Sequence, residues 1–231
     1  MVGYAQQPGT NSAPSPSSII PAISPAATNN VTAAAPPTLP GKLKEALDLL
    51  VGGQIDQALA SVNQALAMDQ KSLRGYLIRG EIYTIKEQWD LAQKDYETAG
   101  QIDPRDVVVK FNLADLKFRK KEYDPAREAF VAIENDPDYG DLSSYKVFLC
   151  DLQAGREDVA NKELSAFEEA ASKPSYFFSH VAWSAAHHKT EDARGWLDSA
   201  LKIYSATKIN LYATTLKNLG YLPLPPAAGA Q

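Results

Sequence analysis

The stretch GEIYTIKEQWDLAQKDYETAGQIDP, from Gly80 to Pro104, contains a pattern that recurs along this chain. It places a small residue, an aromatic residue, an alanine and a proline at distances that other stretches repeat. Its central alanine belongs to a series in which four members are spaced 34 residues apart and a fifth follows 33 later: Ala58, Ala92, Ala126, Ala160 and Ala193. Self-similarity at a fixed period of this length indicates an array of stacked units.

The residues around each alanine have helical spacing. A larger apolar residue stands four positions beyond the alanine and another apolar residue seven beyond, which marks one face of a helix. A second series lies upstream, again 34 residues apart: Ala46, Gly80, Ala114, Phe148 and Ala182. Two helices that cross at about 8–10 Å need small residues at the contact. The sequence therefore predicts an all-α fold, an α-solenoid of five antiparallel helix pairs, in which Phe148 is the exception among small residues.

The pattern resembles the tetratricopeptide repeat, a helix-turn-helix unit of the same length. The match is fullest in the quoted stretch and the residues just before it, where the family's positions are occupied by Tyr76, Gly80, Tyr83, Ala92, Tyr96, Ala99 and Pro104. Other units match less fully: Lys117 replaces an expected aromatic residue, and Phe148 leaves the register of the fourth unit open by one residue. The resemblance covers residues 39–207 and implies a solenoid that binds other proteins.

The chain divides into four predicted parts. Residues 1–40 contain eight of the fifteen prolines and no Asp, Glu, Lys or Arg, so we expect a disordered tail. The array covers 41–207. A helix over 208–220 is expected to cap it, because a last repeat otherwise exposes an apolar face. Residues 221–231 are expected to be a second disordered tail. Within the array, the units are expected at about 39–72, 73–106, 107–140, 141–174 and 175–207.

Composition argues against several classes of function. The net charge is −5 and the pI about 5.3, whereas a nucleic-acid-binding domain normally carries a basic face. No apolar run approaches the roughly 18–20 residues that a membrane-spanning helix needs. The single cysteine, Cys150, rules out an internal disulfide framework and is expected to be a small core residue.

No catalytic motif is evident in the sequence. Phosphate-binding loops, zinc-protease helices and nucleophile elbows each have a signature, and none occurs here. We therefore expect no enzyme activity, no cofactor and no metal. The alternative is a metal-dependent or hydrolytic enzyme that uses the histidines of the fifth unit, His180, His187 and His188. His180 and His187 are seven residues apart on one helix face, where two imidazoles can share a metal. A structural role at the end of a helix is favoured for His187 and His188.

The first helices of stacked pairs line the concave side of an array. An apolar strip along that side suits the apolar face of a partner helix or an extended peptide. The predicted partner-binding residues recur at corresponding positions of successive first helices: Leu77, Glu81, Phe111, Asp115, Phe118 and Tyr145. The alternative interpretation is that some of these side chains pack between neighbouring repeats.

These observations favour a non-enzymatic scaffold or adaptor that holds a partner protein or peptide segment in the concave groove. A further alternative is a structural assembly subunit that stacks through its N-terminal repeat, which shows no cap. Some tetratricopeptide domains clamp the C-terminal carboxylate of chaperones with lysine, asparagine and arginine side chains. That clamp is absent, because Leu77 and Glu81 stand where lysine and asparagine are required.

The start of the chain, MVGYAQQPG, bears on its compartment. Gly3 and Ala5 are two residues apart, as are the small residues before a signal-peptidase site, and the polar tail is similar to the mature start of many exported bacterial proteins. The charged and apolar parts of a signal peptide are missing. We favour an exported, periplasmic protein with a signal-peptide remnant; the alternative is a cytoplasmic protein.

Overall fold

The computed structural model describes residues 37–224. The predicted signal-peptide remnant and most of both predicted tails lie outside these residues. Every regular element from 37 to 224 is helical, and no strand occurs there. The elements are α1 (Leu39–Val51), α2 (Ile55–Met68), α3 (Leu73–Ile85), α4 (Trp89–Ile102), α5 (Val107–Arg119), α6 (Tyr123–Val131), α7 (Gly140–Gln153), α8 (Glu157–Ala166), the short 3-10 helix η1 (Phe167–Ala170), α9 (Pro174–Ala186), α10 (Thr190–Ile203) and α11 (Ala206–Asn218).

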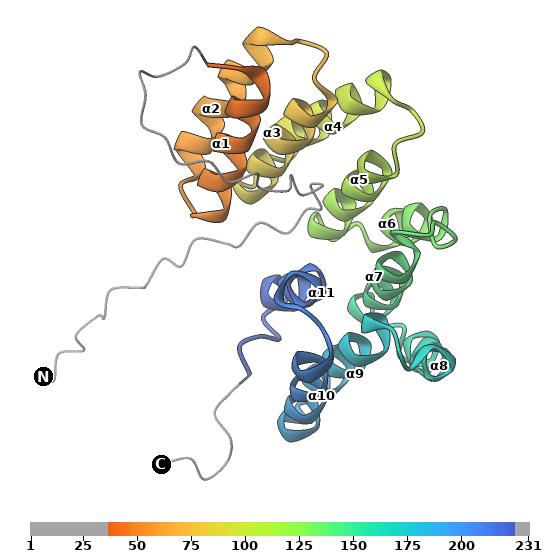
Figure 1. Ribbon diagram of the computed structural model, residues 1–231. Coiled ribbons are helices and arrows are strands. Elements are labelled where there is room, and N and C mark those ends of the chain that lie inside the picture. Colours follow the sequence, from red (N-terminus) through yellow and green to blue (C-terminus); the bar gives the residue numbers. More distant parts are fainter. Residues whose placement is uncertain (1–36, 225–231) are drawn as a thin grey trace, which may run out of the picture.

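The helices pack as consecutive antiparallel pairs, α1 with α2 through to α9 with α10. The pairs follow one another along an arc, and α11 lies on the inner side of that arc (Figure 1). The prediction of an all-α solenoid built from helix pairs is therefore confirmed. Within the described residues no helix is long and apolar enough to cross a membrane.

Each pair turns through one residue in the left-handed backbone region. The five residues with this conformation are Gly53, Glu87, Lys121, Gly155 and His188. In the second pair, the amide of Gln88 then donates to the carbonyl of Tyr83 at 2.8 Å, which satisfies a carbonyl at the end of α3. Because glycine adopts this conformation without steric cost, the turns at Gly53 and Gly155 are the least strained of the five.

The small positions that the sequence singles out lie where paired helices touch. Ala46, Ala114 and Ala182 are fully buried, and so are all five alanines of the second helices. At Gly80 the contact is close, because an added Cβ would lie 2.5 Å from Cε1 of Tyr96 on α4. The spacing of small residues in the sequence is therefore the spacing of helix crossings in the structure.

The fourth pair departs from this rule because Phe148 occupies the small position. Its ring is fully buried, and α7 and α8 make the loosest contact of the five pairs. The second helix ends early, at Ala166, and continues as η1. Phe167 of η1 then packs edge-on against Phe148, with ring centroids 6.1 Å apart. The large residue at this crossing therefore coincides with the loosest contact among the five pairs.

The ends of the array differ in detail from the sequence expectation. Helix α1 begins at Leu39, inside the predicted tail, because Thr38 caps it by accepting the amide of Gly41 at 3.2 Å. At the other end Leu222 is buried, and the hydroxyl of Tyr221 accepts a hydrogen bond from Gln153 at 2.8 Å. Helix α1 thus begins where the first unit is expected, and at the C-terminal end the packed part continues to Leu222, beyond the expected boundary at Gly220.

Candidate functional site

The inner face of the third and fourth units holds a buried group of charges. Asp115 of α5 accepts from Nζ of Lys146 at 2.5 Å and from Nε of Arg119 at 2.9 Å. The ammonium of Lys146 also lies 5.0 Å from the ring centroid of Phe118, in cation–π geometry. Asp115 and Lys146 are both almost completely buried. Their pairing joins two successive first helices, α5 and α7, through their inner sides.

The two cations keep Asp115 ionised. Burial alone would raise the pKa of its carboxyl group, but the charges of Lys146 and Arg119 and their hydrogen bonds hold the pKa below its ordinary value. Removing either cation would leave a buried carboxylate with incomplete compensation, which is costly in a protein interior. Asp115 therefore needs both Lys146 and Arg119 to remain buried as a carboxylate.

Helix α11 covers this part of the inner face. Nζ of Lys146 donates its second hydrogen bond to Oγ1 of Thr215 at 2.6 Å. The ring of Tyr212 stacks on Phe178 of α9, with centroids 5.2 Å apart, and tilts against Tyr145 of α7 at 5.3 Å. Its hydroxyl donates to Asp141 at 2.6 Å. The C-terminal helix thus contacts α7 and α9 with both apolar and polar groups.

The burial of the α7 side chains agrees with the packing of α11 against the inner face. From Leu142 to Leu152 every residue except Ser144 is buried. A first helix in an open array would leave its inner side in solvent, but α7 is surrounded by α6, α8, α9 and α11. The expected helix over 208–220 is present as α11, and it lies on the inner side of the arc beside α7 rather than across the end of α10 (Figure 1).

All six predicted partner-binding residues are buried in the folded chain. Leu77 packs with Ala92 and Tyr96 in the core of the second unit. Phe111 packs against Phe130 at 5.3 Å and against Tyr139 at 5.6 Å between ring centroids. These contacts of the two residues lie within their own units.

The other four predicted residues lie closer to the inner surface. Glu81 accepts a hydrogen bond from the hydroxyl of Tyr96 at 3.4 Å. Asp115, Phe118 and Tyr145 meet Lys146 or α11, so the structure brings these three together at one place. Contact of any of the six with a partner stays a prediction, and in this conformation α11 covers part of the face that they line.

A cavity of about 310 Å³ opens beside the C-terminal end of α11. It is bounded by the turns of the second and third units and by α11, with lining residues that include Trp89, Phe118, Arg119, Asn218 and Leu219. Here Phe118 and Arg119 of the charged cluster approach solvent, since the side chain of Arg119 is 15% exposed. The cavity is the place where the covered inner face becomes accessible.

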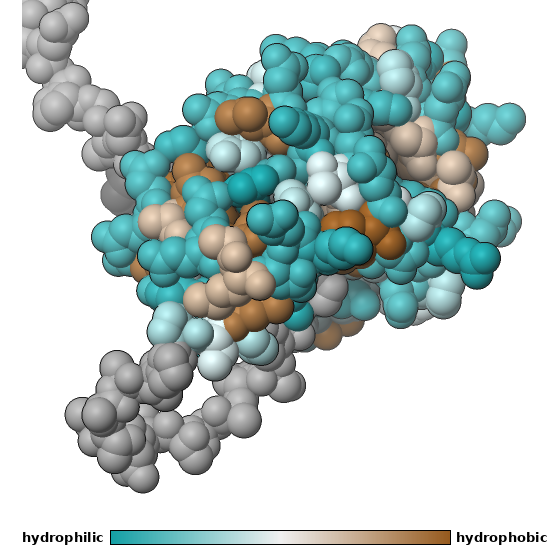
Figure 2. Space-filling view, turned by 90° about the horizontal axis from the view of Figure 1, so that it is seen from above, coloured by the Kyte–Doolittle hydropathy of each residue, from teal (hydrophilic) through white to brown (hydrophobic). Residues whose placement is uncertain are grey.

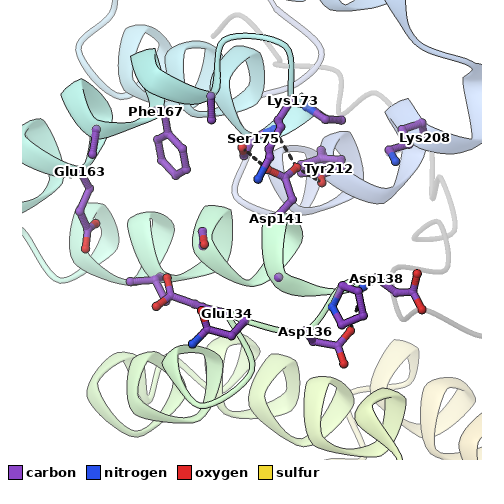
Figure 3. A pocket seen from close by; sticks show the side chains of 18 residues that line it. Glu134, Asp136, Asp138, Asp141, Glu163, Phe167, Lys173, Ser175, Lys208 and Tyr212 are labelled. Carbon is purple, nitrogen blue, oxygen red and sulfur yellow. Dashed lines mark hydrogen bonds between the residues drawn. The ribbon is translucent and has the colours of Figure 1, made fainter.

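A larger cavity, of about 640 Å³, lies between the N-terminal ends of α7, α9 and α11 and the segment from α8 to η1 (Figure 3). It carries the carboxylates of Glu134, Asp136, Asp138, Asp141 and Glu163 and the ammonium groups of Lys173 and Lys208. Asp141 points away from the open space and accepts from the hydroxyls of Ser175 and Tyr212. Its carboxylate therefore ties α7 to α9 and α11.

Glu163, at the edge of this cavity, has an unusual environment. Burial raises the pKa of its carboxyl group to about 7, and the neighbouring carboxylate of Asp151 adds to the shift, while Arg127 opposes it. Asp151 itself accepts from Nε of Arg127 at 2.7 Å and from Nε of Arg156 at 2.5 Å. Two arginines thus stabilise Asp151 as the charged member of the pair, and Glu163 is the member that binds a proton as the pH falls below about 7.

The histidines of the fifth unit have structural contacts. Nδ1 of His187 lies 2.7 Å from the carbonyl oxygen of Trp183, and its Nε2 lies 3.1 Å from Glu157. His180 stacks on Trp196 with centroids 4.2 Å apart, and burial lowers its pKa. Among residues 37–224, no group of three or more His, Cys, Asp or Glu side chains is arranged to hold a metal ion.

Cys150 lies in the core as predicted. It is fully buried in α7, and burial raises the pKa of its thiol to about 12. Since the thiolate is the reactive form, this cysteine is inert at neutral pH.

Sequence reasoning did not assign Lys146, Thr215 and Asp141 to the site. One signal was available for Lys146, since it interrupts an otherwise apolar run between Tyr145 and Val147. A lysine in such a run needs a buried partner. Its partners lie 31 and 69 residues away, at distances that no repeat period indicates.

The face seen from above is mostly hydrophilic, and its hydrophobic residues form separate patches (Figure 2). Large exposed apolar side chains of the described residues are spread over many helices, with Val51 on α1, Leu91 on α4, Val159 on α8 and Leu201 on α10. Scattered residues of this kind are normal for a folded surface. The inner face is therefore the better candidate for a specific site.

Comparison with known proteins gives one curated relative and several solved structures. No protein-family model matches the chain. The Tetratricopeptide repeat protein 21 homolog of Caenorhabditis elegans is 24% identical over 170 residues, which is 73% of this chain. The matched region is 12% of that much longer protein.

The similar solved structures share the repeat fold. A tetratricopeptide repeat protein from Parabacteroides merdae has a TM-score of 0.63 at 15% identity, covering 78% of this chain and 71% of its own. PilW, described as a widely conserved type IV pilus biogenesis factor, has a TM-score of 0.57 at 22% identity, covering 80% of this chain and 87% of its own. Pseudomonas aeruginosa pilF has a TM-score of 0.57 at 16% identity, covering 79% and 88%. At these identities the likeness establishes the fold.

Proposed function

Because the chain folds as a tetratricopeptide-repeat solenoid, we propose that it is a non-enzymatic scaffold that holds a segment of a partner protein against the inner face of its helices. Repeat solenoids of this kind present an extended concave surface suited to binding. The proposal follows from the arrangement of first helices along the inner side of the arc (Figure 1).

One observation carries the proposal furthest. The inner face of α7 and α9 already binds a helix, since α11 packs there through Tyr212, Leu216 and Thr215. A surface that buries one helix has the apolar area and the hydrogen-bonding groups that helix recognition requires. Its function as a binding face is thus supported by its chemistry, independently of any relative.

The accessible part of this face is the cavity beside the end of α11. Phe118 and Trp89 supply aromatic surface there, and Arg119 supplies a guanidinium that carboxylates and carbonyl groups of a partner can approach. A partner segment that enters at this point would continue along the inner side of α7 and α9, where α11 lies in this conformation. Aromatic and arginine side chains of this kind are the residues most often responsible for binding energy.

Site-specific photo-cross-linking tests the proposal. Benzoylphenylalanine is placed at Leu219, which lines the cavity, and in a second chain at Leu201, which is 51% exposed on α10. Both chains are irradiated in extract of the source organism, and the cross-linked peptides are identified by mass spectrometry. We expect one segment of one protein to be captured from Leu219 only.

Leu201 is a matched control because it is also a leucine and lies on a second helix, away from the inner face. Equal capture from both positions would mean that the interaction is not specific to the inner face. Absence of any reproducible captured segment at Leu219 would contradict the scaffold function in this form.

A further inference from the structure

Helix α11 does not cover the exposed end of the last repeat. Only Tyr204 and Ser205 connect it to α10, yet it packs mainly on α9 and reaches across to α7. Leu201 and Ile203, at the end of α10, remain more than half exposed. The apolar end of the array is therefore left partly open, while the inner face is covered.

The seat of α11 is aromatic and closely fitted. Tyr212 is held between Phe178 and Tyr145, and the ring planes of Tyr212 and Phe178 differ by 20°. Leu216, one turn later, is fully buried, and Ile209 is nearly so. These three side chains form one apolar stripe of the helix, as in helices that dock into a groove on another protein.

The polar contact between Lys146 and α11 requires a hydrogen-bond acceptor on α11. Lys146 carries three N–H donors, one directed to Asp115 and one to Oγ1 of Thr215. A docking segment must therefore offer a hydroxyl, carbonyl or carboxylate oxygen at this position. A cation or an alkyl group there would leave the buried ammonium with an unmatched donor.

We propose that the inner face of α7 and α9 is a docking site for an amphipathic helix, and that α11 occupies it as an intramolecular substitute which a partner helix displaces. The recognised pattern is an aromatic residue, an oxygen acceptor three positions later and a leucine four positions later. In α11 these are Tyr212, Thr215 and Leu216. The inference deepens the proposed function and rests on it, because it specifies the chemistry of the held segment and the regulation of access to the site.

Displacement has a measurable consequence. When the native occupant is covalently attached, the site is free in only a small fraction of molecules, and the apparent association constant for any external helix is the intrinsic constant multiplied by that fraction. Weakening the attached helix should raise the affinity for an external one. A structural helix that only completes the core would show no such effect.

The test uses the full-length chain and one defined probe. The probe is a fluorescein-labelled synthetic peptide with the sequence of residues 205–221, and its binding is followed by fluorescence anisotropy. The full-length chain carrying Tyr212→Ala and Leu216→Ala, in which the attached helix is weakened, should bind this peptide at least about tenfold more tightly than the unaltered chain. The chain carrying Asn210→Ala, a change at an exposed position of α11, should bind it as the unaltered chain does.

A second peptide distinguishes specific recognition from nonspecific binding. The same sequence with Thr215→Val keeps the shape of the side chain but lacks the acceptor for Lys146. It should bind the weakened chain about tenfold less tightly than the original peptide. Equal affinities would overturn the assignment of Lys146 and its acceptor as the specific contact.

Two further outcomes overturn the proposal. If the weakened chain keeps its circular dichroism spectrum and does not bind the peptide more tightly, the inner face is not an independent docking site. If the weakened chain loses its helical signal, α11 is an integral part of the fold and cannot be displaced. Neither result decides whether the chain is a scaffold, since cross-linking from Leu219 tests that separately.

Discussion

Gly80 is a residue at which the packing of a helix pair is tightly constrained. An added Cβ would meet three atoms of the Tyr96 ring at 2.5–3.0 Å, and that ring is fully buried between α3 and α4. Gly195, also inside a helix, has open space where its Cβ would be. The same residue type therefore has opposite roles at the two positions.

We expect Gly80→Ala to lower the free energy of unfolding by about 1–3 kcal/mol, because it overpacks the helix crossing. Gly195→Ala should raise it by about 0.5–1 kcal/mol through the higher helix propensity of alanine. Urea unfolding followed by circular dichroism measures both. Changes of the same sign at the two positions would mean that the crossing at Gly80 is not close.

The titration of Glu163 makes the free energy of unfolding depend on pH. Its pKa is raised to about 7 in the folded chain, chiefly by burial, and is about 4.3 when unfolded. Between these values the folded chain binds more protons than the unfolded chain. The contribution of this group is therefore fully present below the unfolded pKa and is lost as the pH rises through about 7.

Replacing the carboxyl group of Glu163 with an amide removes the loss of stability at high pH. We expect Glu163→Gln to raise the free energy of unfolding at pH 8 by about 1 kcal/mol, and to change it much less at pH 5, where Glu163 is protonated in the folded chain. Denaturant unfolding at the two pH values is the measurement. Glu128→Gln, at an exposed position of α6, should shift stability by less than about 0.5 kcal/mol at either pH. An equal effect of Glu163→Gln at both pH values would contradict the assignment.

At the scale of single helices, the first three units begin their two helices differently. Side chains cap the first helices α1, α3 and α5, through Thr38, Ser72 and Asp106, whereas the first helices α7 and α9 have no side-chain cap. The second helices have no side-chain cap, but each has an acidic residue in its first turn. Those carboxylates favour the positive end of the helix dipole, so in the first three units the two helices are stabilised by different means.

This difference predicts unequal effects of cap removal. Asp106 accepts the amide of Val109 at 3.0 Å, so Asp106→Ala should lower the free energy of unfolding by about 1 kcal/mol. Gln88 precedes α4 without a side-chain hydrogen bond, so Gln88→Ala should change it by less than about 0.5 kcal/mol. Thermal or urea unfolding of the two variants compares them directly. A larger loss at Gln88 would contradict the cap assignment.

Across the whole molecule, the apolar core is divided unevenly. The first unit and the second unit each have a small core cluster, whereas the third to fifth units and α11 share one large cluster. Repeat arrays are stabilised by each unit and by its nearest neighbours, so stability follows the local core. We therefore expect the C-terminal part to be more stable than the first unit.

Hydrogen exchange tests this distribution. Amides of α2 should exchange faster than amides of α7, because α2 opens with the first unit alone and α7 opens only when the large cluster is disrupted. Exchange measured by mass spectrometry on the intact chain gives the order. Identical rates in both helices would indicate a single cooperative unit instead.

The repeat architecture was predictable from the sequence because its signal is local and recurs. Each crossing needs a small residue and each helix needs an apolar face, so the period of 34 residues records the geometry of one pair five times over. Phe148 was visible as an exception in the same series. The way in which neighbouring helices accommodate its ring, with Phe167 of η1 packed against it, was not recorded in that series.

The state of the inner face was not predictable in this way. Leu77, Phe111 and Tyr145 have the spacing of an open strip, but burial depends on what packs against them. Lys146 meets Thr215 across 69 residues, and Tyr212 stacks on Phe178 of another unit. These contacts arise once, outside the period, so no recurring pattern records them. Periodicity specifies how neighbouring helices pack, whereas the position of α11 follows from the combined surface of α7 and α9, which exists only after the pairs have stacked.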